Sequence, residues 1–203
     1  SGSLPVSFSG SNLTISGTYT LSCTNSTLTF AGGGTSFYNV TFASTATSLT
    51  INGTNTFNNL TFASKSSSGT TTVQFNATQY INGTLTVSAP ATLGSSRYFF
   101  TTASIGTTQI ITAAAVSLTD VDFRDIINNT GTTWTGTRLG DCGGNTGITF
   151  PAAKTVYWNL PGSQSYISMG WATTPTGVPA STNFPLPQDT AIFTDTAPVA
   201  GST

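Results

Sequence analysis

The chain has 203 residues, and only 11 of them are charged, five Lys or Arg and six Asp. Its formal net charge is −1, and charged side chains make up 5% of the chain against a usual quarter or so. Such a chain lacks the positive field that attracts nucleic acid or an anionic membrane, so we expect neither DNA nor RNA as a partner. It contains no His and no Glu. Since His is the commonest general base and metal ligand, we expect no catalytic residues, no metal and no cofactor.

Hydrophobic residues make up 37% of the chain and include 13 Phe, so the sequence has the material for an ordered core. Thr, Ser, Gly and Asn together account for 103 residues. No apolar run approaches the roughly 18 to 20 residues of a membrane span, and we expect no span. The chain begins Ser1-Gly2-Ser3 without an initiator Met, so we expect a fragment or a processed product of a longer protein.

From the N-terminus onward, short segments alternate apolar and polar residues, which predicts strands with one buried face. Three examples are Leu49-Thr50-Ile51, Leu60-Thr61-Phe62 and Leu85-Thr86-Val87. They are rich in Thr, Val, Ile and Phe and are bounded by Gly, Asn and Ser, which favour turns. No capped segment shows a 3.6-residue apolar period, so we expect very little helix.

A loose repeat of about 20 to 25 residues, the length of one solenoid coil, runs through the first two thirds of the chain. Residues 37–42 (FYNVTF) and 57–62 (FNNLTF) share a pattern of Phe, Asn, aliphatic, Thr and Phe, and both are followed by Ala-Ser. A third copy ends at Leu85-Thr86-Val87, and residues 118–123 (LTDVDF) resemble a fourth in which Asp replaces Asn. A tandem repeat of this length indicates a solenoid.

We therefore predict an all-β fold, a right-handed parallel β-helix (β-solenoid) over residues 1–150. Equivalent positions of successive coils stack about 4.8 Å apart, where like charges repel and neutral Thr, Ser and Asn do not, which accounts for the scarcity of charge. The alternative is an antiparallel β-sandwich or jelly roll, whose loops need no fixed period. Cys23 and Cys142 would lie several coils apart in the solenoid, so we expect two unpaired thiols.

The repeat stops near Gly140, and the segment 151–203 holds seven of the nine prolines and two of the three tryptophans. Because proline does not fit a central strand, we predict a loop-rich segment that caps the solenoid or leads to a next unit. Its pattern resembles one found in large repetitive β-helix proteins of bacteriophage virions and bacterial surfaces. The residues that carry this resemblance are 155–158 (TVYW), Gly162, 170–172 (GWA) and 185–193 (PLPQDTAIF).

Two groups of side chains are candidates for a site. Asp120, Asp122 and Asp125 supply oxygen ligands of the kind that calcium prefers. In the repeat alignment, however, Asp120 and Asp122 occupy ladder ends that we expect to face water, which favours a structural or solvated role. Three tryptophans, Trp134, Trp158 and Trp171, are candidates for stacking on sugar rings, and the alternative is that they pack beneath the proline-rich tail.

The resemblance and the composition together predict a non-enzymatic structural segment of a virion-surface or extracellular assembly. A bacteriophage fibre, appendage or decoration protein is the first expectation, and a bacterial adhesin or carbohydrate-binding module is the alternative. A polysaccharide lyase or hydrolase on the same scaffold ranks below both. The expected partners are other virion or fibre subunits, further copies of the chain through self-association, and a cell-surface glycan.

Overall fold

The computed structural model describes residues 3–7, 14–22, 26–43, 46–66, 69–90, 96–160 and 164–193. Across these residues the secondary structure is β-strand apart from a single 3-10 turn, η1 (Ser181–Asn183). The prediction of an almost helix-free, all-β chain is confirmed. Within the described part of the chain, no helix has the length and apolar character needed to cross a bilayer.

Strands alternate along the chain between two parallel sheets. The seven-stranded sheet runs in the order β1 (Ser3–Ser7), β3 (Thr27–Ala31), β5 (Ser48–Asn52), β7 (Gly69–Phe75), β9 (Ser96–Thr102), β11 (Val121–Phe123) and β13 (Gly140–Asp141). The six-stranded sheet runs in the order β2 (Thr14–Leu21), β4 (Ser36–Phe42), β6 (Asn55–Phe62), β8 (Gln79–Val87), β10 (Gln109–Leu118) and β12 (Ile126–Ile127).

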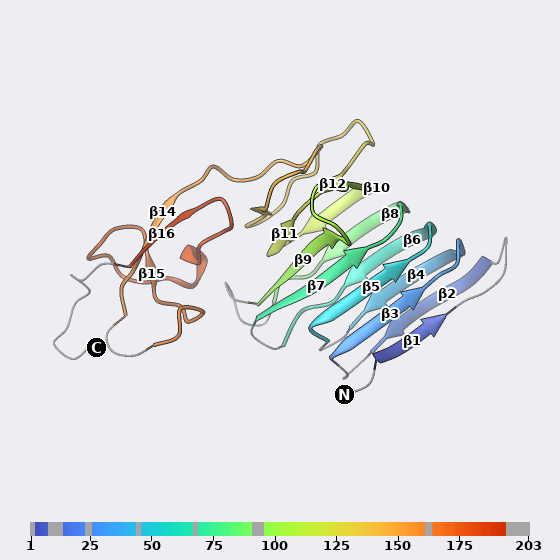
Figure 1. Cartoon of the computed structure of the whole chain (residues 1–203), viewed down its shortest axis with the longest axis horizontal. Coiled ribbons are helices and arrows are strands. Elements are labelled where there is room, and N and C mark those ends of the chain that lie inside the picture. Colours follow the sequence, from blue (N-terminus) through green and yellow to red (C-terminus); the bar gives the residue numbers. More distant parts are fainter. Residues whose placement is uncertain are drawn as a thin grey trace.

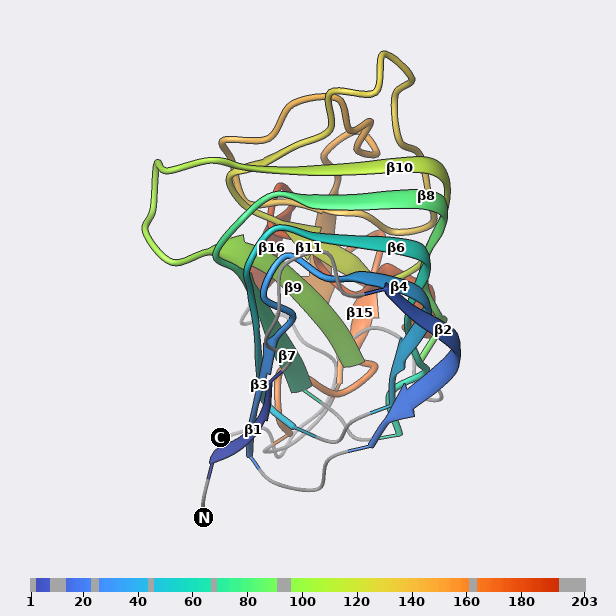
Figure 2. The ribbon, with the colours of Figure 1, turned by 90° about the vertical axis from the view of Figure 1, so that its right-hand side faces the viewer.

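Because each strand pairs with the strand two places along the chain, the polypeptide winds as a solenoid (Figure 1). Seen along the direction of stacking, the two sheets enclose the space between them (Figure 2). The solenoid prediction is confirmed. The sandwich alternative is wrong, because every strand pair in these two sheets is parallel, whereas a sandwich is built from antiparallel pairs.

The register between β4 and β6 is the one that the repeat predicted. Phe37 pairs with Phe57, Asn39 with Asn59 and Phe42 with Phe62. Side chains then reinforce the stack from outside, since Asn59 Nδ2 donates to Asn39 Oδ1 at 2.9 Å. Asn39 Nδ2 in turn donates to Thr18 Oγ1 at 3.1 Å, so uncharged side chains link these neighbouring coils.

Coil length varies more widely than the repeat predicted. The coil that joins Phe42 to its partner Phe62 is short, and the coil that joins Asp122 to Gly140 is shorter still. The coil between Gln79 and its partner Ile111 is much longer than either. Turns between the strands absorb most of this variation, and register shifts within three strand pairs, β2–β4, β6–β8 and β8–β10, absorb single residues.

The core consists of apolar side chains stacked between the two sheets. Phe62 is completely buried, and its ring centroid lies 5.5 Å from that of Phe42 and 4.8 Å from that of Phe100. The rings thus connect successive coils as well as opposite sheets. Each such ring removes a large apolar area from water, and its truncation to Ala typically costs about 3–5 kcal/mol.

The fourth repeat copy was predicted wrongly. Leu118 does continue the inner column, since it pairs with Val87 at the end of β10. Asp122, however, lies in β11 of the other sheet and pairs with Phe99 of β9. Asp120 causes the difference, because its positive φ of 54° turns the chain from one sheet to the other. The segment 118–123 therefore spans a corner of the solenoid and is not a single strand.

The tail forms a small mixed sheet beyond the last coil (Figure 1). In this sheet β14 (Thr155–Trp158) pairs in parallel with β16 (Thr190–Phe193) and antiparallel with β15 (Trp171–Ala172). Its buried apolar cluster is separate from the solenoid core and consists of Val156, Trp158 and Trp171. The expectation that this segment leads to a next unit stays a prediction.

Cys142 is a free, partly buried thiol, as expected. The other cysteine, Cys23, lies outside the described residues, as does Gly162 of the tail pattern.

Candidate functional site: a buried arginine–aspartate network

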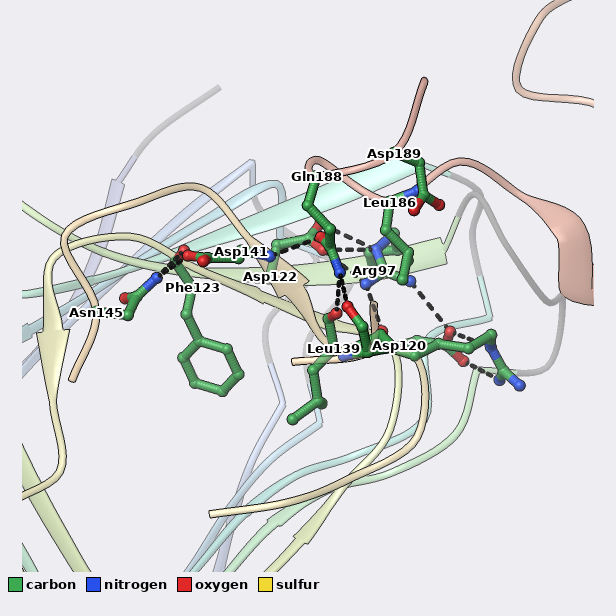
Figure 3. A network of polar contacts seen from close by, with 12 residues as sticks. Arg97, Asp120, Asp122, Phe123, Leu139, Asp141, Asn145, Leu186, Gln188 and Asp189 are labelled. Carbon is green, nitrogen blue, oxygen red and sulfur yellow. Dashed lines mark hydrogen bonds and ion pairs between the residues drawn. The ribbon is translucent and has the colours of Figure 1, made fainter. Parts of the chain in front are cut away.

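The charges that the sequence places far apart meet at the last coils of the solenoid (Figure 3). Arg97 comes from β9, Asp120 from the corner before β11, Asp122 from β11 itself, and Arg138 from the turn before β13. Asp120 and Arg138 both have positive φ, 54° and 53°. Asp enters this left-handed region more readily than most residues, whereas for Arg it is unusual, so the fold around Arg138 must supply compensating contacts.

Arg97 is the centre of the network. Its Nε donates to both carboxylate oxygens of Asp122, at 3.0 and 2.9 Å, and its Nη2 donates to Asp122 Oδ1 at 2.6 Å. Its Nη1 donates to Asp120 Oδ1 at 3.1 Å, and its Nη2 also reaches the carbonyl oxygen of Arg138 at 2.7 Å. The planar, forked guanidinium is suited to binding two carboxylates in this way.

Arg138 completes the network from the opposite side of Asp120. Its Nε donates to Oδ1 at 2.7 Å and its Nη2 to Oδ2 at 2.6 Å. The hydrogen bond to Asp120 raises the pKa of Arg138, burial lowers it, and the negative charge of Asp120 raises it again, with a net upward shift. Two guanidinium groups thus face two carboxylates, and the network has no net formal charge.

Three of the four members of the network are buried, and Arg138 lies at its rim with a side chain that is 20% exposed. Residue exposure is 3% for Arg97, 1% for Asp120 and 7% for Asp122. The expectation that Asp120 and Asp122 face solvent at ladder ends is therefore wrong. Burial of a charge is tolerated because each ion finds a partner, and removal of one partner would leave the other charged and buried.

The calcium interpretation of Asp120, Asp122 and Asp125 does not fit this geometry. Both carboxylates of the network are bound by guanidinium groups, and Asp125 Oδ2 accepts instead from the backbone N–H of Gly106 at 2.9 Å. Among the residues that the structure describes, no group of three His, Cys, Asp or Glu side chains is close enough to hold a metal ion.

A third arginine, Arg124, flanks the network. Arg124 Nη2 donates to Thr101 Oγ1 at 2.9 Å, and its guanidinium lies 5.1 Å from the ring centroid of Phe99. Its Nε is 3.9 Å from Asp125 Oδ2, and its side chain is 28% exposed. A partly exposed pair of this kind contributes little compared with Arg97.

Gln188 attaches the tail to this end of the solenoid. Its side-chain oxygen accepts from the backbone N–H of Asp141 at 2.9 Å, and its amide nitrogen donates to the carbonyl oxygen of Leu139 at 3.1 Å. The amide thus takes the place of a further strand at the edge of β13. A Cβ on Gly140 would lie 1.9 Å from Asp122 Oδ1 and 2.5 Å from Pro187 Cδ, so only Gly permits both contacts.

The turn that carries Gln188 is held by a buried carboxylate. Asp189 Oδ1 accepts from the backbone N–H of Lys154 at 3.0 Å, and Oδ2 accepts from that of Leu186 at 2.8 Å. The Lys154 ammonium also forms an ion pair with Asp189. The Pro-Gln-Asp part of the tail motif thus has a structural explanation in these contacts.

The three tryptophans considered for sugar binding are all core residues. Trp134 is 2% exposed and packs against Phe123, with 6.5 Å between ring centroids. Trp158 and Trp171 are 9% and 1% exposed and lie edge to face at 5.2 Å. None of them presents an open ring face, so the sugar-platform interpretation does not describe their positions. Packing within the proline-rich tail describes Trp158 and Trp171, whereas Trp134 packs in the solenoid core.

Exposed aromatic rings occur instead on the six-stranded sheet, and the sequence analysis did not single them out. Tyr38 in β4 is 53% exposed and Tyr80 in β8 is 43% exposed. The signal available in the sequence was their position among outward-facing polar residues, since Tyr80 pairs with Thr56 and Thr112.

Lys65 and Cys142 are ionisable residues outside the network whose pKa values are shifted. Burial lowers the pKa of Lys65, whose ammonium donates to Thr71 Oγ1 and lies 5.6 Å from the ring centroid of Tyr98. Burial, with the nearby carboxylates of Asp122 and Asp141, raises the pKa of the Cys142 thiol to about 11. A thiol with such a pKa is a poor nucleophile at neutral pH.

Comparison with protein-family models, with curated proteins and with solved structures finds no match to this chain. The functional argument therefore depends on the fold and on the chemistry of the described residues.

Proposed function

We propose that the chain is a non-enzymatic structural rod segment. The observation that carries the proposal is the in-register stacking of neutral side chains on the outside of the solenoid. Thr20, Thr41, Thr61, Thr86 and Ser117 occupy equivalent positions on five successive strands of the six-stranded sheet. Such a stack would transmit load through the parallel backbone hydrogen bonds between coils, with amide side-chain bonds added between β4 and β6, between β5 and the residue after β7, and between β6 and β8, which suits a stiff spacer better than a catalyst.

The proposed setting is a bacteriophage virion, as a fibre, appendage or decoration protein, and the alternative is a bacterial extracellular adhesin. The support is the tail motif, whose Trp158, Trp171 and Phe193 come together in one cluster, with centroid distances of 5.2 to 6.0 Å. A nearly uncharged surface is also poorly suited to a free soluble protein, which favours incorporation into an assembly.

The setting is tested by immunogold labelling with antibodies raised against the purified chain. Label on intact phage particles supports the virion assignment, and label on bacterial cell surfaces supports the adhesin. Label on neither would overturn both.

A second candidate function is glycan binding, which the exposed rings of Tyr38 and Tyr80 favour. The expected result is retention of the chain on immobilised cell-surface polysaccharide, lost in Tyr38→Ala and Tyr80→Ala but kept in Tyr38→Phe. Loss on Trp158→Ala is expected only if the tail unfolds, because that ring is buried.

A lyase or hydrolase activity would contradict the proposal directly. Incubation with host-type polysaccharides is expected to give no new reducing ends and no unsaturated products. Turnover that disappears in a folded Asp122→Ala variant would show that the network is catalytic after all.

A further inference from the structure

The solenoid and the tail sheet have separate cores. The solenoid core includes Trp134, whereas the tail core consists of Val156, Trp158 and Trp171. Figure 1 shows the tail sheet set apart from the coils. Two units with separate cores are expected to move and to unfold independently unless specific contacts join them. The contacts between tail and coils therefore decide whether the chain behaves as one body.

The side-chain amide of Gln188 binds the last strand of the seven-stranded sheet as a peptide group would (Figure 3). Its Oε1 accepts from the backbone N–H of Asp141 at 2.9 Å, and its Nε2 donates to the carbonyl oxygen of Leu139 at 3.1 Å. Nε2 also donates to the carbonyl oxygen of Pro151 at 3.3 Å, in the segment that leads to β14. Since a carboxamide has both donors and an acceptor, one side chain satisfies all of these groups.

The next residue fixes the same turn to the tail sheet. The side chain of Asp189 is completely buried, and its carboxylate accepts from the backbone N–H groups of Lys154 and Leu186 at 3.0 and 2.8 Å. Lys154 directly precedes β14, and Asp189 directly precedes β16. Two neighbouring residues of one turn thus bind the last coil on one side and the tail sheet on the other.

The turn is preorganised for this double contact. Pro185 and Pro187 restrict φ on both sides of Leu186, which is 6% exposed. A restricted backbone loses less conformational entropy when the turn closes. A Cβ on Gly140 would lie 2.5 Å from Pro187 Cδ, so the turn approaches β13 as closely as a residue without a side chain permits.

We propose that the turn 185–189 is a conformational latch, in which Gln188 joins the tail sheet to the last coil so that the two cores unfold together. With the latch closed, the tail has a fixed direction relative to the solenoid. With the latch open, the tail turns and unfolds without the coils. A hydrogen-bonded amide suits such a device, because it can open without a change in either core. The latch goes beyond the rod proposed above and does not depend on the setting of that rod.

The test replaces Gln188 by Met, which has a similar length but neither donates nor accepts as an amide does. Gln74→Met is the matched control. Gln74 is also partly buried, but it lies within the solenoid in β7, and its amide donates to Asn76 Oδ1, two residues along the chain, at 2.7 Å. The control therefore removes an amide that does not join the tail to the coils.

Fluorine NMR of the chain labelled with fluorotryptophan follows both units during urea unfolding. Trp134 reports on the solenoid, and Trp158 and Trp171 report on the tail. Single Trp→Phe variants assign the three signals. Hydrogen exchange at the backbone N–H of Asp141 measures the latch itself, because this group donates to Gln188.

In the wild-type chain, the three folded fluorine signals are expected to disappear at one urea midpoint. In Gln188→Met, the two tail signals are expected to disappear at a midpoint about 1 M below that of Trp134, because the tail loses its hydrogen bonds to the coils. The N–H of Asp141 is expected to exchange about 10-fold faster. Gln74→Met is expected to change neither the coincidence of the midpoints nor this exchange rate.

Separate midpoints for solenoid and tail in the wild-type chain would overturn the proposal, since the units would then be independent with the amide in place. Coincident midpoints in Gln188→Met would show that other contacts join the units. An equal separation in Gln74→Met would show a general effect of amide loss. A fall of the Trp134 midpoint to that of the tail signals would mean that Gln188→Met destabilises the coils directly, which would also overturn the latch.

Discussion

Replacement of Arg97 by Met removes the positive charge at the centre of the buried network and keeps most of the side-chain volume. Arg97 is 3% exposed and is the common partner of Asp120 and Asp122. Asp120 would keep its two bonds to Arg138. Asp122 would lose the hydrogen bonds that it accepts from Arg97 Nε and Nη2 and would stay buried.

Loss of one partner from a buried ion pair typically costs about 3–5 kcal/mol, since the remaining charge is left desolvated without compensation. We expect Arg97→Met to fall in this range. With a urea dependence of about 2 kcal/mol/M, the unfolding midpoint would decrease by roughly 2 M. Far-UV circular dichroism follows the strands, and tryptophan fluorescence follows Trp134 in the solenoid core together with Trp158 and Trp171 in the tail, so urea titration with both probes measures the effect.

Two further variants separate electrostatics from packing. Arg97→Met combined with Asp122→Leu restores charge balance and is expected to recover most of the loss. Arg124→Met, at a partly exposed guanidinium, is expected to cost less than about 1 kcal/mol. A loss below about 1 kcal/mol for Arg97→Met, or failure of the double variant to recover stability, would refute the account of a network stabilised by mutual neutralisation.

Three other changes test the remaining parts of the structure. The double variant Thr41→Asp, Thr61→Asp places two carboxylates one coil apart, and we expect their repulsion to cost about 0.9 to 3.5 kcal/mol of stability beyond the sum of the single variants. A double-mutant cycle measures this coupling energy. The penalty should decrease with added NaCl and should be absent when position 61 carries Lys. Phe62→Ala removes a fully buried ring and is expected to cost about 3–5 kcal/mol in urea unfolding; a cost near 1 kcal/mol would contradict the stacked core. Burial raises the pKa of Cys142 from 9.0 to about 11. With the other cysteine replaced by Ser, iodoacetamide at pH 8 should therefore alkylate Cys142 about 100-fold more slowly in the folded chain than in the urea-unfolded chain. Equal rates would show that the thiol is not desolvated.

A fifth prediction concerns Lys65, whose pKa burial lowers from 10.5. The folded state therefore disfavours the protonated amine relative to the unfolded state, and the cost is fully present below the folded pKa. Lys65→Met is expected to raise the free energy of unfolding at neutral pH, with a gain that diminishes as the pH approaches 10.5, where the unfolded amine also loses its proton. Chemical unfolding at several pH values measures the difference, and a gain that grows with pH would have the wrong sign.

The sequence was enough to predict the solenoid and part of its register. The pairing of Phe42 with Phe62 and of Asn39 with Asn59 follows from a local pattern repeated at a constant interval. Stacked coils require compatible residues at each level, so the pattern recurs in the copies that end at Phe42, Phe62 and Val87 and is visible there without coordinates. The near absence of charge follows from the same requirement.

The repeat pattern could not predict the candidate site. Arg97 lies 25 residues before Asp122, and Gln188 lies 47 residues after Asp141. These separations depend on turn lengths that vary from coil to coil, so no fixed interval connects the partners. The corner at Asp120 also moved Asp122 into the other sheet, which reversed its predicted exposure.

The tryptophans likewise separate what the sequence could predict from what required the tertiary structure. Their presence in the tail was visible in the sequence, but an aromatic ring is equally suited to a core and to a sugar platform. Only the tertiary structure decided between them, because burial depends on which segments fold over the ring. The amino-acid sequence by itself determined the winding of the chain, since that is a property of neighbouring coils. The tertiary structure decided where the few charges and indoles meet, since that depends on the summed lengths of all the turns between them.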